Sequence, residues 1–232
     1  MIGIIAAMDM ELEELLLCMQ NASFKTISGR KFVSGTIEGV PVVAVVCGIG
    51  KVNAALCAEA MILSYAPEAV INTGVGGALD KALKISDVVV ADWAVQYDCD
   101  TSALGDPVGF VSTVNTLRFE TDEKLSLAIK RALENSGARA ASGGIATGDR
   151  FVSRAEEKDA IVRGFGCVCC EMEGCAIAQV CRINAVPCAI IRAISDGADE
   201  DAGMSYQTFA AGAAKTSARA LIRFLAENRD CL

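Results

Sequence analysis

Short apolar runs that end in glycine or in a polar residue recur along the chain. Residues 42–47 and 187–194 are nearly uninterrupted, which is typical of strands covered on both faces of a sheet. Residues 69–77 begin in the same way and run into glycines, which predicts a buried strand followed by a glycine-rich loop. Further strands are expected at residues 2–7, 25–37, 87–92, 140–146 and 166–170.

Between these runs, apolar residues recur at helical spacing. Helices are expected at residues 8–17, 52–63, 122–136, 174–180 and 205–225. Residues 98–115 form a long irregular segment, and connections of that length often serve as lids, interfaces or binding walls. The alternation of strands and helices predicts an α/β fold. No linker or composition break divides the chain, so one domain over residues 1–232 is expected.

Three acidic residues, Glu11, Glu173 and Asp196, lie where buried strands stop, with Glu11 just past the carboxyl end of its strand. In α/β sheets the carboxyl ends of the strands are where ligands bind. Glu171 and Glu173 lie between two apolar stretches, and burying an ionised carboxylate without partners costs about several kcal/mol. These acids therefore find donors in the fold or on a ligand. The alternative is that Glu11, Glu171 and Glu173 only bind the amides at a helix start.

The overall charge limits the class of partner. The formal net charge is −8, so a nucleic acid or an anionic membrane would be repelled over the whole surface. Small neutral or cationic ligands remain. The chain has no apolar segment of about 18 residues and starts with a strand rather than a cationic leader, so we expect a cytoplasmic protein.

The chain contains no histidine, which excludes Ser-His-Asp catalysis, Cys-His catalysis and histidine-bound metals in one chain. Acid and base catalysis then falls mainly to carboxylates. Eleven cysteines suit a reducing compartment, and most stand in apolar runs, where a free thiol behaves as a small hydrophobe. The cluster around Cys167, Cys169 and Cys170 lacks the spacing of a zinc or iron–sulfur site, so no metal is expected.

The turn Gly48-Ile49-Gly50-Lys51 follows a buried strand and lets the backbone approach a ligand closely. It matches half of a dinucleotide fingerprint, but Asn53 stands where the third glycine would be. No cofactor is therefore expected.

Paired carboxylates suit the cleavage of an N-glycosidic bond. The sugar becomes cationic while the base leaves with negative charge, so one carboxyl must donate a proton and another must activate a water. A third can accept hydrogen bonds from sugar hydroxyls. Burial that raises the pKa of one carboxyl while its neighbour stays ionised would divide these duties.

The chain resembles the 5′-methylthioadenosine/S-adenosylhomocysteine nucleosidases of the purine nucleoside phosphorylase superfamily. The matching segments are Ile4-Ile5-Ala6-Ala7-Met8 with Glu11, Gly48-Ile49-Gly50-Lys51-Val52, Asn72-Thr73-Gly74 with Gly76-Gly77, Asp98-x-Asp100, Thr147-Gly148-Asp149-x-Phe151, Glu171-Met172-Glu173 and Arg192-Ala193-Ile194-Ser195-Asp196. The resemblance implies a single-domain three-layer αβα sandwich around a mixed, mostly parallel sheet. It also implies a homodimer that hydrolyses adenine nucleosides with water as co-substrate.

The resemblance further implies a role for each matching residue. Glu11 would activate the water, Asp196 would protonate purine N7 and Glu173 would bind the ribose hydroxyls. The other implied substrate-binding residues are Met8, Ile49, Gly76, Phe151, Val152, Glu171, Met172, Arg192, Ser195, Tyr206 and, from the partner subunit, Leu104. Phe151 would stack on adenine, and Tyr206 would lie beside the 5′-thio group.

Some positions depart from the family pattern. Val75 stands where many members have serine, Tyr206 replaces a common phenylalanine, and Tyr97 replaces a frequent histidine. These changes affect the preference for the 5′ group rather than the bond that is cut. Alternatives are a nucleoside phosphorylase, a futalosine-type nucleoside hydrolase, a nucleoside sensor without activity, and a redox or metal protein built on the cysteines.

Overall fold

The structure is a computed structural model, and it describes residues 1–229. Its strands are β1 (Ile2–Ala6), β2 (Gln20–Ile27), β3 (Arg30–Ile37), β4 (Val40–Val46), β5 (Ala69–Ala78), β6 (Val88–Gln96), β7 (Phe119–Glu120), β8 (Ala140–Thr147), β9 (Cys169–Glu171) and β10 (Cys188–Asp196). Its α-helices are α1 (Asp9–Cys18), α2 (Lys51–Tyr65), α3 (Glu123–Asn135), α4 (Ala155–Phe165), α5 (Gly174–Ile183) and α6 (Ala202–Asn228). The predicted α/β fold is confirmed. The single domain over residues 1–232 stays a prediction, and residues 230–232 lie outside the described residues.

The strands form one mixed sheet in the order β10, β6, β8, β9, β5, β1, β4, β3 and β2, and β7 pairs with β6. Its centre is parallel, because β1 pairs in parallel with β4 and β5, and β5 with β10. Since β5 pairs with both β9 and β10, the strands β5, β10, β6, β8 and β9 close on themselves. This closure brings the ends of β8 and β9 beside the ends of β1, β5 and β10.

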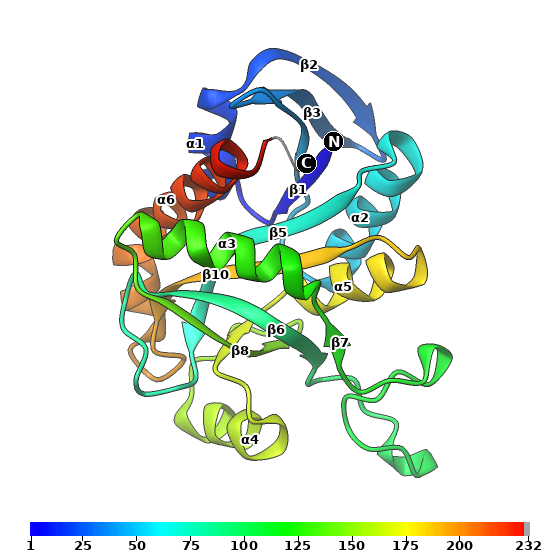
Figure 1. The fold of residues 1–232 in the computed structure, drawn as a ribbon. Coiled ribbons are helices and arrows are strands. Elements are labelled where there is room, and N and C mark those ends of the chain that lie inside the picture. Colours follow the sequence, from blue (N-terminus) through cyan, green and yellow to red (C-terminus); the bar gives the residue numbers. More distant parts are fainter. Residues whose placement is uncertain (230–232) are drawn as a thin grey trace.

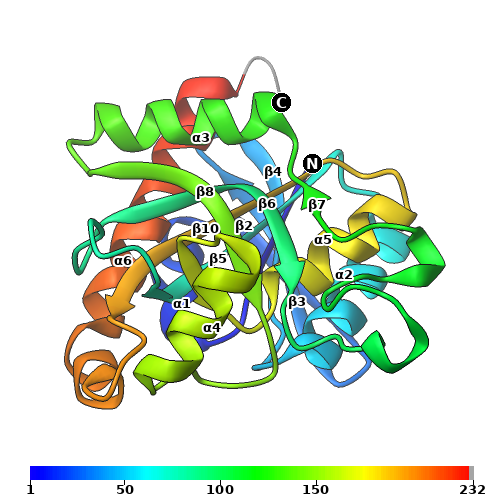
Figure 2. The ribbon, with the colours of Figure 1, turned by 90° about the horizontal axis from the view of Figure 1, so that it is seen from below.

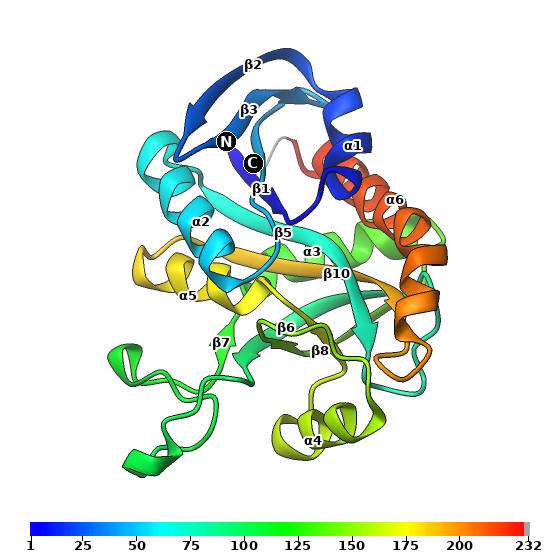
Figure 3. The same cartoon turned by 180° about the vertical axis from the view of Figure 1, so that it is seen from behind.

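Helices cover both faces of the sheet (Figures 1 and 3). Successive residues of β1 point to opposite faces. Ile2 and Ile4 pack in one apolar cluster with residues of α1, α3 and α6, and Ile5 packs in a second cluster with α2 and α5. Helix α4 lies apart from both layers (Figures 1 and 3) and stands in front of the strands in the view of Figure 2. It covers a smaller cluster that contains Val152 and Ile161.

The sequence predicts a glycine-rich loop at the end of this strand, and that prediction is wrong. β5 continues through these glycines to Ala78. β10 and β9 hold this part of β5 by pairing with it on either side. The glycines serve close packing instead of a turn. A Cβ at Gly76 would lie 2.7 Å from Cys169 Sγ, a distance that no real side chain tolerates.

The segment between β6 and β7 contains two short 3-10 helices, Ser102–Leu104 and Ser112–Val114. Figures 1 and 3 show it extending away from the sheet. Leu104 lies on it with 83% of its surface exposed. The irregular segment expected from the sequence is therefore present, and it offers an apolar side chain to solvent.

The cysteines in the described part of the chain are free thiols, and eight of these ten are buried. The prediction that most act as small apolar residues is confirmed by this burial. Within residues 1–229, no three His, Cys, Asp or Glu side chains are grouped so that they could hold a metal ion. No helix in the same range combines the length and apolar character needed to cross a bilayer.

Candidate active site

The three acids that the sequence singles out, Glu11, Glu173 and Asp196, line one cavity of about 100 Å³. Nine other expected site residues line the same cavity: Met8, Ile49, Gly76, Phe151, Val152, Glu171, Met172, Ser195 and Tyr206. A larger hollow of about 430 Å³ shares Arg150 and Val152 with this cavity but contains none of the three acids. The smaller cavity is therefore the candidate active site.

Glu11 is held by backbone amides directly after β1 and within β5. Its Oε2 accepts hydrogen bonds from Ala7 N and Met8 N, each at 2.9 Å, and its Oε1 accepts one from Val75 N at 3.0 Å. Burial raises the pKa of Glu11, although Arg192 and these amides oppose the shift. A Cβ at Gly74 would lie 2.5 Å from Glu11 Oε1, so only glycine leaves room for the carboxylate there.

Asp196 is the last residue of β10, directly after a shift in the pairing register with β5. Ser195 Oγ donates to Asp196 Oδ2 at 2.8 Å, and Ala198 N donates to Oδ1 at 2.9 Å. Burial raises the pKa of Asp196 against the effect of these two donors. The carboxyl therefore keeps its proton to a higher pH than a solvated aspartate, as an acid catalyst requires.

Glu173 precedes α5 and accepts a hydrogen bond from Gly50 N on its Oε1 at 2.8 Å. Its Oε2 lies 3.8 Å from Arg192 Nη2. Burial and the neighbouring Glu171 raise the pKa of Glu173 to about 7. One oxygen is thus fixed by the glycine turn after β4, and the other is available to a ligand in the cavity.

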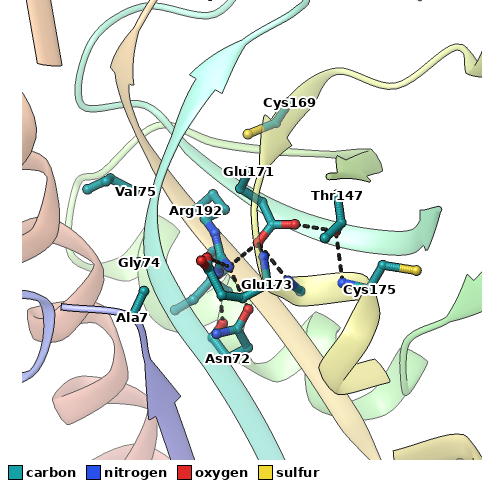
Figure 4. A network of polar contacts seen from close by, with 12 residues as sticks. Ala7, Asn72, Gly74, Val75, Thr147, Cys169, Glu171, Glu173, Cys175 and Arg192 are labelled. Carbon is teal, nitrogen blue, oxygen red and sulfur yellow. Dashed lines mark hydrogen bonds and ion pairs between the residues drawn. The ribbon is translucent and has the colours of Figure 1, made fainter. Parts of the chain in front are cut away.

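Glu171 and Arg192 form a buried ion pair beneath the cavity (Figure 4). Glu171 also accepts hydrogen bonds from the Thr147 hydroxyl, from Glu173 N at 2.9 Å and from Gly174 N at 2.7 Å. Arg192 donates further to Asn72 Oδ1 at 2.6 Å. Because Glu173 N and Gly174 N both donate to Glu171, this network fixes the backbone that carries Glu173. Removing either partner of the ion pair would leave a buried charge unpaired, which is strongly destabilising.

This arrangement differs from the substrate contacts expected for the ion pair. Arg192 is 2% exposed and is not among the residues that line the cavity. Glu171 lines it, but protein donors occupy both of its carboxylate oxygens. Both residues hold other site residues in place. The sequence did not indicate Asn72 and Thr147 as their partners, because such contacts join positions far apart in the chain.

The opposite wall of the cavity is apolar. The rings of Phe151 and Tyr206 meet edge to face with centroids 5.6 Å apart, and Phe151 is 41% exposed. The Tyr206 hydroxyl donates to Met8 Sδ at 3.0 Å. Ile49 lines the same cavity, whereas Leu104 of this chain does not. The wall therefore combines an aromatic face with a thioether and one hydroxyl.

A family model described as the phosphorylase superfamily matches residues 1–226. This chain belongs to the phosphorylase superfamily. The resemblance inferred from its sequence motifs is thereby confirmed, and so is the fold expected from it.

The proteins similar to this chain include nucleosidases. A 5′-methylthioadenosine/S-adenosylhomocysteine nucleosidase of Shewanella loihica is 37% identical over 97% of this chain and 98% of its own length. An aminodeoxyfutalosine nucleosidase of Helicobacter pylori is also 37% identical, over 95% of each chain. A crystal structure of the Neisseria meningitidis 5′-methylthioadenosine/S-adenosylhomocysteine nucleosidase in complex with methylthio-immucillin-A superposes with a TM-score of 0.94. It is 38% identical and covers 97% of this chain and 98% of its own.

Proposed function

We propose that this superfamily member hydrolyses the N-glycosidic bond of 5′-methylthioadenosine and S-adenosylhomocysteine, and also of 5′-deoxyadenosine. The products are adenine and the 5-substituted ribose. The observation that carries this proposal is the meeting of Glu11, Glu173 and Asp196 in one cavity. The names of the relatives support the choice of substrates.

The proposed reaction divides proton transfer between two acids. Protonated Asp196 donates to purine N7, so adenine leaves without negative charge while the C1′–N9 bond breaks. Ionised Glu11 takes a proton from a water, whose oxygen bonds to the cation-like C1′. Two protons and one water are thus accounted for, and no metal or cofactor takes part. The raised pKa of Asp196 supports the role of acid. The three backbone amides that donate to the Glu11 carboxylate support an ionised base.

The remaining residues bind the substrate. Glu173 would accept hydrogen bonds from the ribose hydroxyls with the oxygen that faces the cavity. Phe151 would stack on adenine, and Met8, Ile49 and Tyr206 would surround the 5′-thio group. The edge-to-face contact of Phe151 with Tyr206 supports these two assignments, because it places the residue proposed to bind adenine next to a residue proposed to bind the 5′ group.

A second candidate substrate is aminodeoxyfutalosine, since a relative of equal identity carries the name of that activity. The bond to be cut and the residues that cut it would be the same. The hydroxyl of Tyr206 places a polar group on the 5′ side, where the two kinds of substrate differ. Incubating each nucleoside separately and comparing kcat/KM for adenine release distinguishes the two.

Phosphate is expected to leave the rate of adenine release unchanged. Phosphorolysis needs a free cationic pocket, whereas the cavity is lined by acids and by one basic residue, Arg150, which pairs with Glu157 at 2.6 Å. Two further basic residues, Lys51 and Arg30, lie near the glycine turn but do not line the cavity. Lys51 pairs with Asp98, and Arg30 donates to Asn53 Oδ1 at 3.0 Å. The test measures adenine and free reducing sugar with and without phosphate. A rate that rises with phosphate, with a sugar phosphate as product, would overturn the proposed hydrolysis.

Phe151→Ala is expected to weaken nucleoside binding by about 1–3 kcal/mol through lost stacking and burial. The change should raise KM more than it lowers kcat, because stacking acts on bound substrate and transition state alike. Phe24→Ala is the matched control, since Phe24 is an exposed phenylalanine on β2. Equal KM values for the Phe151 variant and the control would contradict the stacking role.

We infer that the chain works as a homodimer in which Leu104 completes the 5′ side of the partner's cavity. The exposure of Leu104 on its projecting segment supports this, and so does the exposed apolar side of α2 with Val52, Leu56 and Leu63.

Val52→Asp is expected to give a monomer with reduced kcat/KM. Leu104→Ala should stay dimeric and raise KM. Analytical ultracentrifugation with kinetics checks both, and a monomeric wild-type protein at full activity would exclude the dimer.

A further inference from the structure

Three segments that border the candidate active site are tied together by Lys51, Asp98 and Asp149. The Lys51 ammonium lies 2.6 Å from Asp98 Oδ1, and Asp149 N donates to Asp98 Oδ2 at 2.8 Å. Lys51 N donates to Asp149 Oδ1, also at 2.8 Å. These three contacts close a ring between the start of α2, the segment after β6 and the segment after β8. We call it the lysine–aspartate ring.

The ring is adjacent in sequence to residues on both sides of the cavity. Gly50, directly before Lys51, donates its N–H to Glu173 Oε1, the proposed ribose-binding group. Phe151 and Val152 follow Asp149 by two and three residues and line the opposite side. A displacement within the ring would therefore change the separation between the sugar side and the base side.

The local backbone makes this connection depend on Asp149. Gly50 has a φ of 98° and no side chain with which to cap α2, so Asp149 supplies the acceptor for the first amide of that helix. A Cβ at Gly50 would approach Asp149 Oδ1 to 3.0 Å. Carboxylates favour the N-terminus of a helix because they bind its free amides and offset its dipole.

None of the three ring residues lines the candidate active site. Lys51 and Asp98 keep 18% and 30% of their side-chain surface exposed. An isolated ion pair with this exposure contributes little to stability. Any effect of the ring on the reaction must then come through the residues that it positions, not through contact with the substrate.

We propose that the lysine–aspartate ring sets the spacing between Glu173 and Phe151. The sugar and the base of an intact nucleoside are then each held against the residue that binds them. Lys51, Asp98 and Asp149 are positioning residues. This inference rests on the proposed nucleosidase function. A small misplacement of a bound substrate can lower the rate about a hundredfold when its sugar and its base must both be aligned. A loosened ring should therefore affect an intact nucleoside, in which sugar and base are joined, and not free adenine.

The test is a double-mutant cycle of Lys51→Met and Asp98→Ala, with Lys130→Met as control because its ammonium donates to Ser142 Oγ on a different face. Each single variant is expected to lower kcat/KM for methylthioadenosine about tenfold, and the double variant no further than either. The inhibition constant of free adenine should change by less than about twofold, since the base side itself stays intact. Asp98→Asn, which keeps an acceptor for Asp149 N, replaces Asp98→Ala if the latter does not fold.

Three results would overturn the inference. They are an unchanged kcat/KM in the Lys51 and Asp98 variants, losses that multiply in the double variant, and a weakening of adenine inhibition in parallel with kcat/KM. The last two would indicate independent local damage. If the wild-type protein releases no adenine, the proposed function is wrong. If the wild-type protein is active and the ring variants match its kcat/KM, the proposed function stands and only the inference about the ring is wrong.

Discussion

Asp196→Asn is expected to fold and to bind nucleoside but to lose about 10²–10⁴-fold in kcat. The amide keeps the shape of the carboxyl and can still hydrogen-bond to purine N7, but it has no proton of suitable acidity to transfer. Adenine would then leave with its negative charge uncompensated. Single-turnover adenine release, compared with nucleoside affinity measured by calorimetry, separates the chemical step from binding.

The pH dependence provides a second measure of the same role. Burial raises the pKa of Asp196, so the acid form persists to higher pH than in water, and the rate should fall as the pH rises past that pKa. This descending limb should be absent in the Asp196→Asn variant. Asp159→Asn, at an exposed position on α4, is the control and should match the wild type. Wild-type turnover by the Asp196→Asn variant would remove Asp196 from the chemistry.

Glu11→Gln is expected to bind nucleoside and to lose about 10²–10⁴-fold in kcat, because the attacking water is left without a base. The glutamine amide can replace the carboxylate at only one oxygen, since its nitrogen cannot accept a hydrogen bond from Val75 N or from Ala7 N and Met8 N. A change in thermal stability must therefore be measured beside the kinetics. Glu13→Gln, an exposed position on the same helix, controls for the loss of a helix carboxylate.

The wild-type pH profile should also contain an ascending limb from Glu11. Burial raises the pKa of this carboxyl, so the base becomes protonated at a higher pH than a solvated glutamate, and activity should decline as the pH falls below that pKa. Hydrolysis at the wild-type rate by the Glu11→Gln variant would show that another group activates the water.

The sequence placed the acids correctly because buried strands are recognisable as apolar runs, and their carboxyl ends can be located within a residue or two. Glu11, Glu173 and Asp196 were found in this way, and they line one cavity. Helix α4 was missed because it has few apolar side chains, and only Ile161 is buried among its eleven residues. The two-residue strand β7 is too short to have a pattern.

Strand order and side-chain partners could not be inferred from hydrophobic periodicity. Nothing in the local sequence indicates that β9 pairs back onto β5, which is the closure that brings Glu171 and Glu173 beside Glu11. The partners of Arg192 were also missed, since Asn72 and Glu171 lie 120 and 21 residues away in the chain. Such contacts depend on the tertiary fold.

Gly74 limits the ways in which this protein could escape an inhibitor. A compound that bound in the cavity against the Glu11 carboxylate would rely on the room that Gly74 leaves for that carboxylate, because a side chain at residue 74 would displace it. Resistance by substitution at residue 74 would then cost the base that activates water. Binding of the compound and hydrolysis of the substrate would both require glycine at residue 74. A substitution there that weakened the compound would therefore also impair the enzyme.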